Sequence, residues 1–261
     1  MRALDSHAHL DFPDFDKDRE ALIAELAEAE IGVINIATDK ASLARVDQLS
    51  RDNPLIWGAV GIHPTEVGPK AVVSINEIIG KLAALREGNP KIVALGEIGL
   101  DYFHSQEHVG DQKVVLGELL NYAREHDSPV IFHCRDAYGD LLTILARYPG
   151  LRGVVHCFSG NAEQAAAFLD FGLHLSFTAM LTYKANDSLR EIARDVPLEK
   201  LLLETDAPFL APQSRRGERN DPRTILEIAQ LHGELRNVST EEILRQTTAN
   251  AIKLFGLKDA N

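Results

Sequence analysis

The chain opens with Arg2-Ala3-Leu4-Asp5-Ser6-His7-Ala8-His9, a short apolar run that turns polar at its end. An amphipathic stretch follows at Asp18–Glu30, where Leu22, Ile23 and Leu26 stand at helical spacing. The same order of apolar run, polar turn and amphipathic stretch recurs along the sequence. No Gly-rich phosphate loop follows the first run, which argues against an open dinucleotide-binding sheet.

Seven further runs have the length and composition of buried strands. The predicted strands are Arg2–His9, Val33–Thr38, Ile56–His63, Ile92–Gly99, Val130–Arg135, Gly153–Phe158, His174–Phe177 and Leu201–Asp206. Helical segments are expected between them, including Val72–Glu87, and two more at Pro222–Arg236 and Ser239–Phe255. Apolar strands that alternate with helices indicate a parallel sheet, and eight such strands can close into a barrel. We predict an α/β fold, a (β/α)₈ TIM barrel, in one domain over residues 1–261.

Composition excludes several classes of protein. The formal net charge is −12, which argues against a broad basic surface for nucleic acid. No apolar stretch is long enough to span a membrane, and no leader-like apolar segment follows Met1, so a cytoplasmic protein without an obligate protein partner is the default expectation. The two cysteines, Cys134 and Cys157, lack a CxxC pairing and are expected to be packed thiols.

Polar residues gather at the C-terminal ends of the predicted strands. They are His7, His9, His63, Glu97, His133, His156 and Asp206. The C-terminal strand ends of a barrel form one rim, where barrel enzymes keep their active sites. Imidazole and carboxylate together suit divalent cations, and six ligands exceed the need of one hydrolytic metal. We therefore predict two cations that share a carboxylate, with Mg²⁺ expected first and Mn²⁺ or Zn²⁺ left open.

The ligands of this predicted site are His7, His9, Glu97, His133, His156 and Asp206. By strand alternation Asp5 should share a face with His7 and His9, either orienting a histidine or lying in the barrel floor. Glu204 should lie one layer below Asp206 on the same face. Gly61-Ile62-His63-Pro64 carries either a functional histidine or a loop entrance. The remaining histidines are expected to be non-catalytic, His104 being the most ambiguous.

Six motifs in order resemble the TatD family of metal-dependent deoxyribonucleases, within the amidohydrolase superfamily. They are residues 5–10 (Asp-Ser-His-Ala-His-Leu), 61–64 (Gly-Ile-His-Pro), 96–102 (Gly-Glu-Ile-Gly-Leu-Asp-Tyr), 133–135 (His-Cys-Arg), 156–160 (His-Cys-Phe-Ser-Gly) and 204–208 (Glu-Thr-Asp-Ala-Pro). Residues 219–222, Arg-Asn-Asp-Pro, resemble the family's tail, where Asn-Glu-Pro is commoner. The resemblance covers nearly the whole chain.

The resemblance implies one cation on His7, His9, Glu97 and Asp206, and a second on Glu97, His133 and His156. Many relatives in the superfamily bridge their metals with a carbamylated lysine. The only lysine of the fourth strand region, Lys91, lies at its opposite end, so the sequence also favours a bridging Glu97. The resemblance further implies 3′-5′ exonuclease action on single-stranded DNA.

The catalytic candidates are Asp206, Glu97 and His63. We hypothesise that the metals activate a water and that Asp206 accepts its proton. His63 and Arg135 would hold a phosphate or polarise the leaving group. Arg219 and Asn220 are further candidates for substrate binding, and the loop with Arg215 and Arg216 either grips phosphate at the mouth or is merely solvated.

Two other functions remain open. The same site would hydrolyse a carboxylic ester or amide, such as an aminoacyl ester, because an activated water also attacks carbonyl carbon. Alternatively, the protein is a scaffold or binding protein whose metals serve only stability. Turnover that requires metal would separate this last possibility from the hydrolases.

Overall fold

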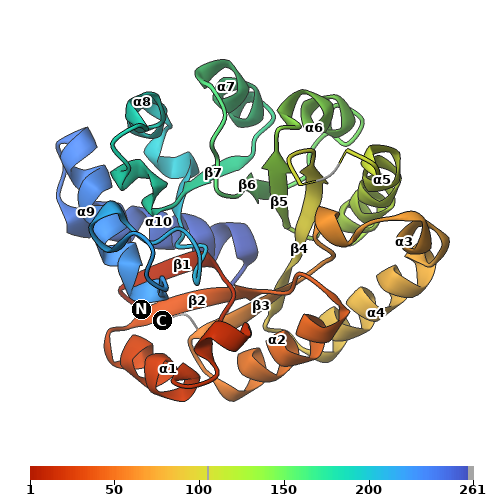
Figure 1. Ribbon diagram of the computed structural model, residues 1–261, viewed down its shortest axis with the longest axis horizontal. Helices are drawn as coiled ribbons and strands as arrows, with labels where there is room; N and C mark the ends of the chain where they lie inside the picture. Colours follow the sequence, from red (N-terminus) through yellow and green to blue (C-terminus); the bar gives the residue numbers. More distant parts are fainter. Residues whose placement is uncertain (105, 258–261) are drawn as a thin grey trace.

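A computed structural model describes residues 1–104 and 106–257 (Figure 1). The strands of this described part are β1 (Ala3–Ala8), β2 (Ile31–Ile36), β3 (Ile56–Val60), β4 (Ile92–Asp101), β5 (Val130–Arg135), β6 (Gly153–Val155), β7 (His174–Phe177) and β8 (Leu201–Leu203). They form an 8-stranded sheet in sequence order, and each strand is parallel to the next. The predicted α/β barrel is confirmed.

The barrel closes between β8 and β1. A parallel bridge joins Ala8 to Ala207. The backbone N–H of Asp206 donates to the carbonyl of His7 at 2.9 Å, and the Ser6 hydroxyl donates to the carbonyl of Leu203 at 2.9 Å. These bonds bring the first and last metal-ligand candidates of the chain side by side.

Helices surround the strands (Figure 1). They are α1 (Arg19–Glu28), α2 (Lys40–Asp52), α3 (Pro69–Val73), α4 (Ile75–Gly88), α5 (Val109–Glu125), α6 (Tyr138–Leu145), α7 (Ala162–Asp170), α8 (Asp187–Asp195), α9 (Ile225–Arg236) and α10 (Thr240–Phe255). The helix predicted at Val72–Glu87 is two helices, because the Ser74 hydroxyl donates to the carbonyl of Lys70 at 2.8 Å and ends α3 there. Short 3₁₀ turns are η1 (Pro13–Phe15), η2 (Pro64–Glu66), η3 (Ala179–Thr182), η4 (Leu198–Lys200), η5 (Gln213–Arg215) and η6 (Pro222–Thr224). No helix of the described residues is both long and apolar enough to cross a bilayer.

Two apolar clusters separate the inside of the barrel from its outer layer. The inner cluster joins strand side chains such as Leu4, Trp57 and Ile131 with Leu254 and Phe255 of α10. Helix α10 therefore covers the end of the barrel opposite the polar rim, where its apolar side chains meet those that fill the barrel. The outer cluster lies between the strands and the surrounding helices.

Bulges in β1 and β4 interrupt the expected alternation of side chains. The register shifts between Asp5 and Ala8 of β1, and again between Leu95 and Ile98 of β4. Each bulge turns one ligand candidate into the barrel, His7 in β1 and Glu97 in β4. The prediction that Asp5 shares the face of His7 is therefore wrong. Asp5 instead accepts hydrogen bonds from the hydroxyl and backbone N–H of Thr205, between β1 and β8.

The predicted strands three, six and eight extend past the observed ones. Cys157 and Asp206, which follow β6 and β8, have φ angles of 46° and 56°. This left-handed backbone leaves the sheet ladder and turns the rim residues toward the barrel axis. The ligand candidates His63, His156 and Asp206 accordingly lie just beyond the ends of their strands.

Close backbone packing beneath the rim depends on Gly99. A Cβ atom added at Gly99 would lie 1.9 Å from the carbonyl oxygen of His133, and its φ of +154° also disfavours other residues. The Gly99→Ala variant should be destabilised by more than about 2 kcal/mol, measured by urea unfolding. Gly80→Ala is the matched control in α4, where the added Cβ meets nothing within 4 Å. It should be stabilising by up to ~1 kcal/mol; an equal, small effect in both variants would contradict this account.

His232 of α9 is a buried imidazole against Phe177, with ring centroids 5.9 Å apart. Neither ring nitrogen has a hydrogen-bond partner among the described residues. Burial, and next the Arg236 charge, lower the pKa of His232 from 6.5 to about 3. The unfolded chain therefore takes up a proton that the folded chain resists, so stability falls as the pH decreases from 6.5 toward 3.

Replacing this imidazole with an apolar side chain should remove its contribution to acid sensitivity. His232→Leu should retain roughly 2 kcal/mol more stability than the parent at pH 5, because no ring remains to be protonated in the unfolded chain. Urea unfolding at pH 7 and pH 5 measures the difference. The control is His126→Leu at the exposed end of α5. An unchanged pH dependence in His232→Leu would refute the assignment.

Candidate metal centre

Four imidazoles surround the carboxylate of Glu97 at the C-terminal end of the barrel. Its Oε2 lies 2.8 Å from Nε2 of His7 and 3.3 Å from Nε2 of His156. Its Oε1 lies 3.0 Å from Nε2 of His63 and 3.8 Å from Nδ1 of His133. The bulge in β4 thus places one carboxylate between ligand candidates from β1, β3, β5 and β6.

His9 and Asp206 complete the cluster on the side of β1 and β8. Nε2 of His9 lies 3.4 Å from Oδ1 of Asp206 and 3.3 Å from Nε2 of His7. The His7 and His156 rings stack with centroids 4.0 Å apart. The structure brings all six predicted ligands together, from strand ends separated by about 200 positions of chain.

The side chains form three overlapping groups of possible metal ligands, and within each group the donor atoms lie within 4.8 Å of one another. They are His7 with His9 and Glu97, His7 with His156 and Asp206, and His63 with Glu97 and His133. His156 therefore lies as near the β1 side as the β5 side, and His63 joins a group from which the predicted ligand sets omit it.

The cluster fits divalent cations. Oε2 of Glu97 is buried, and although Nε2 of His7 lies 2.8 Å away, this oxygen has no hydrogen bond of regular geometry among the described residues. Burial opposes ionisation of Glu97, yet the neighbouring His156, His63 and His7 hold the pKa of its carboxyl well below the usual range. A buried carboxylate that faces imidazole nitrogens is the donor set that hydrolytic metals use.

The partners of the outer ring nitrogens decide which imidazoles present a lone pair. Nδ1 of His9 donates to the carbonyl of Ile36 at 3.1 Å, because that oxygen can only accept. Nε2 of His133 donates to Oδ2 of Asp101 at 3.0 Å. The free lone pairs of His9 and His133 therefore point into the cluster, as metal ligation requires.

His63 has the opposite arrangement. Its Nδ1 accepts the backbone N–H of Thr65 at 3.2 Å, so its Nε2 carries the proton that faces Glu97. Burial lowers the pKa of His63 to about 4, so the ring is neutral near pH 7. In this structure His63 therefore presents an N–H, rather than a lone pair, to Glu97.

Asp101 and Glu204 contact the imidazoles of His133 and His156 at the ring nitrogens that face away from Glu97. Asp101 accepts from His133, from the backbone N–H of His104 at 2.9 Å and from its Nδ1 at 2.8 Å. Although burial opposes it, these hydrogen bonds hold the pKa of Asp101 below its usual range. Oε1 of Glu204 lies 3.6 Å from Nδ1 of His156. Sequence reasoning missed the role of Asp101. The signal was its position four residues after Glu97 on the same strand, which places both side chains on the same face.

The cluster forms the floor of a cavity of about 750 Å³. Its wall residues include Thr38, His104, Arg135, Cys157, Met180 and Phe209. The Arg135 guanidinium lies 3.7 Å from the centroid of the Phe103 ring and makes no ion pair within the described residues. Arg135 is thus a free cation at the mouth, where the sequence predicted it. Cys134 is buried, as expected, while Cys157 is half-buried in the cavity wall.

Two predicted substrate-binding residues lie elsewhere. The guanidinium of Arg219 binds both carboxylate oxygens of Asp18 at 2.6 Å and packs on Phe15. Asn220 is 0% exposed, and its amide donates to the carbonyls of Thr205 at 3.1 Å and Phe209 at 2.8 Å. Both side chains are committed to holding the loop after β8, so we do not propose contact with substrate.

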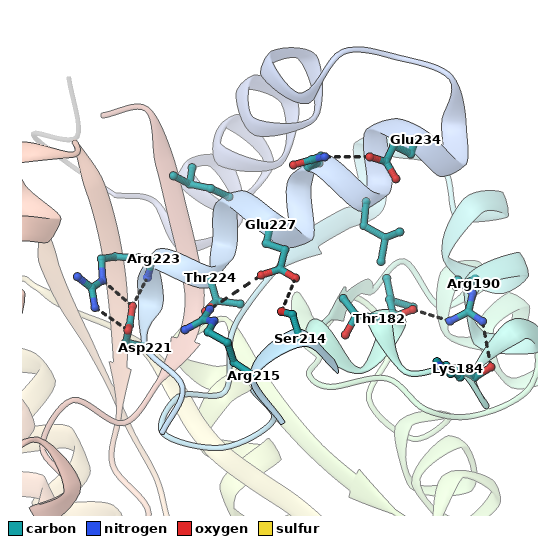
Figure 2. Close-up of a pocket in the computed structure, with 14 residues that line it drawn as sticks. Thr182, Lys184, Arg190, Ser214, Arg215, Asp221, Arg223, Thr224, Glu227 and Glu234 are labelled. Carbon is teal, nitrogen blue, oxygen red and sulfur yellow. Dashed lines mark hydrogen bonds and ion pairs between the residues drawn. The ribbon is translucent and has the colours of Figure 1, made fainter. Parts of the chain in front are cut away.

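Arg215 also points away from the metal cavity. It lines a second cavity of about 1010 Å³ beside α9, shown in Figure 2. Its guanidinium donates to Thr224 at 2.8 Å and lies 3.9 Å from Glu227, while Arg223 pairs with Asp221 at 2.8 Å (Figure 2). Arg215 and Arg223 thus have carboxylate partners, whereas Arg216 lies exposed over the Tyr183 ring and has no ion pair among the described residues.

Fold and donor cluster together define the class of a metal-dependent hydrolase on a barrel scaffold. A family model described as TatD related DNase matches residues 4–256. An uncharacterized metal-dependent hydrolase, YabD, of Bacillus subtilis (strain 168) is 35% identical over 257 residues, which cover 96% of this chain and 98% of the relative. A protein of Erwinia billingiae named 3′-5′ ssDNA/RNA exonuclease TatD is 34% identical over 262 residues, which cover 97% of this chain and 98% of the relative.

The crystal structure of YJJV, a TatD homolog from Escherichia coli K12, matches with a TM-score of 0.87 and 32% identity, covering 98% of this chain and 99% of that one. The chain therefore belongs to the TatD family of metal-dependent hydrolases, which confirms the resemblance of its motifs.

Removal of the Asp101 carboxylate should weaken metal binding. Asp101→Ala frees the His133 ring to rotate, so affinity for Mn²⁺ or Zn²⁺ at pH 7 should fall by about 10- to 100-fold, measured by isothermal titration calorimetry. The control is Asp195→Ala, whose carboxylate is exposed and pairs with Arg194. Unchanged affinity in a folded Asp101→Ala protein would show that the His133–Asp101 contact does not position a ligand.

Proposed function

We propose that the protein is a metal-dependent nuclease that removes nucleotides from unpaired ends of DNA, in the 3′-5′ direction. The observation that carries the proposal is the cluster of imidazoles around Glu97 at the floor of a cavity with a free arginine. The name of the Erwinia billingiae relative, an exonuclease for single-stranded DNA and RNA, supports the same substrate class and polarity.

Two divalent cations, Mg²⁺ foremost, are proposed as cofactors. His7, His9, Glu97 and Asp206 would hold the first, and Glu97, His133 and His156 the second, with Glu97 between them. Cations bound here would supply a water of lowered pKa and a counter-charge for phosphoryl oxygens. The fixed lone pairs of His9 and His133 support these ligand sets.

The protein's own groups handle protons and substrate charge. The imidazoles of His9, His7 and His156 outweigh the effect of burial and lower the pKa of Asp206, so its carboxylate is ionised near neutral pH and can accept a proton. Nε2–H of His63 faces Oε1 of Glu97 at 3.0 Å, and it would donate to a phosphoryl or leaving-group oxygen once that carboxylate binds the proposed cations. Arg135, which makes no ion pair with the described residues, supplies a positive charge for the substrate.

The shape and charge of the cavity favour an end over the middle of a duplex. Its ligands lie at the floor of a cavity of about 750 Å³, into which one strand end can enter. The net charge of −12 offers no extended basic track, on which non-specific duplex binding depends. Positive charge near the floor comes chiefly from Arg135 and the proposed cations.

The decisive assay uses single-stranded oligonucleotides labelled at either end, with Mg²⁺, Mn²⁺ or Zn²⁺ and with a chelator. A metal-dependent ladder that shortens from the 3′ end is expected, together with loss of activity to background in His7→Ala/His9→Ala, because both rings are proposed ligands. His126→Ala, at the exposed end of α5, is the control and should keep full activity.

Other results separate the alternatives. Metal-dependent turnover of an aminoacyl-ester panel with intact oligonucleotides would replace the nuclease with an ester or amide hydrolase. A large stability loss on chelation without any turnover would favour a metal-stabilised scaffold. Ladder formation that persists in the double histidine variant would refute the metal assignment.

A further inference from the structure

One side of the metal cavity has a wall of aromatic side chains, which we call the aromatic wall and which consists of Phe12 and Phe209. Their rings meet edge to face, with centroids 5.9 Å apart and an interplanar angle of 85°. Both contact the proposed ligand His9, at centroid distances of 4.8 Å for Phe12 and 6.2 Å for Phe209. The wall therefore adjoins the place where a phosphoryl group would be held.

Phe209 is exposed, although a buried side chain holds the backbone of its loop. Half of its surface (50%) is open to solvent, and it joins Phe103 as the exposed aromatic residues among the described large apolar side chains. The buried amide of Asn220 donates to the carbonyl of Phe209 and so fixes its backbone. Covering this half-exposed ring with the flat face of a ligand would remove apolar surface from water, and the adjoining Phe12 extends the surface that such a ligand would cover.

The lining of this side specifies the chemistry of the ligand. Next to the wall, the cavity is lined by the apolar side chains of Met180 and Leu210. A flat, uncharged ring attached to a phosphate satisfies both the wall and the adjoining metal centre. A nucleobase is such a ring, and its stacking on an aromatic face is tolerant of sequence.

The opposite side of the mouth complements this arrangement. There Arg135 lies over Phe103, and its guanidinium is free of ion pairs within the described chain. The metal centre thus lies between an apolar aromatic face and a cation. One side suits a base and the other suits the phosphate that continues the strand.

We propose that the aromatic wall binds the base of the terminal nucleotide, a subsite for an unpaired nucleobase of any identity. This inference rests on the proposed nuclease function and deepens it, because a paired base has no free face to offer the wall. It assigns Asn220 a positioning role, through Phe209, in place of the predicted contact with substrate.

The test pairs a variant of the wall with a change in the substrate. Phe209→Ala should raise the KM for a single-stranded oligonucleotide by about tenfold, since it removes one stacking partner. An oligonucleotide whose terminal nucleotide is abasic should show a similarly raised KM with the parent protein and no further rise with Phe209→Ala. Phe209→Tyr should restore the parent value. The control is Val73→Ala, at a side chain that is 89% exposed on α3.

Equal losses on the normal and the abasic substrate would overturn the subsite, because Phe209 would then act on something other than the base. A binding measurement makes the result independent of catalysis. In Phe209→Trp, the fluorescence of the new indole should change on titration with deoxyadenosine monophosphate and remain constant with deoxyribose 5-phosphate. The buried Trp57 gives a constant background.

The two proposals fail in different ways. A fluorescence response to the nucleotide without hydrolysis of any oligonucleotide would retain the subsite and refute the nuclease. Hydrolysis of oligonucleotides with no difference between nucleotide and sugar phosphate in the Phe209→Trp titration would retain the nuclease and refute the subsite.

Discussion

The structure depends on one buried carboxylate, Glu97, enclosed by imidazoles from four other strands. A group of this kind is costly to bury unless opposite charge compensates it, and here the neighbouring imidazoles of His156, His63 and His7 hold its pKa well below the usual range. Much of the rim serves this single placement. The bulge in β4 turns Glu97 inward, Gly99 lets β4 approach β5, and Asp101 fixes the ring of His133.

The barrel and the membership of the ligand cluster were predictable, because parallel strands that follow one another around a barrel bring their C-terminal ends to one rim. The face of β1 on which the Asp5 side chain lies could not be predicted, because a bulge of one residue reverses the alternation on which the prediction relied. The tautomer of His63 also lay beyond sequence reasoning. It follows from the backbone N–H of Thr65, whose direction depends on the turn that follows β3.

The loop after β8 illustrates a second limit. A dense run of arginines beside Asp206 has the composition of a phosphate-binding loop, but composition does not show which carboxylates lie across the fold. Arg219 meets Asp18, which is 201 positions away, and Arg215 lies near Glu227. Arg135 and Arg216 lie over aromatic rings and have no ion pair among the described residues. Long-range ion pairs therefore decided which predicted cations face the mouth.

Helix α10 gives the barrel a single entrance. Leu254 and Phe255 join the apolar cluster inside the strands and close the end of the barrel opposite the polar rim. Side chains also fill the barrel interior, so no channel runs through it. A substrate of the proposed nuclease would therefore enter through the mouth of the metal cavity, and its product would leave through the same opening. Entry and exit through this one opening would then alternate in each catalytic cycle of the proposed nuclease.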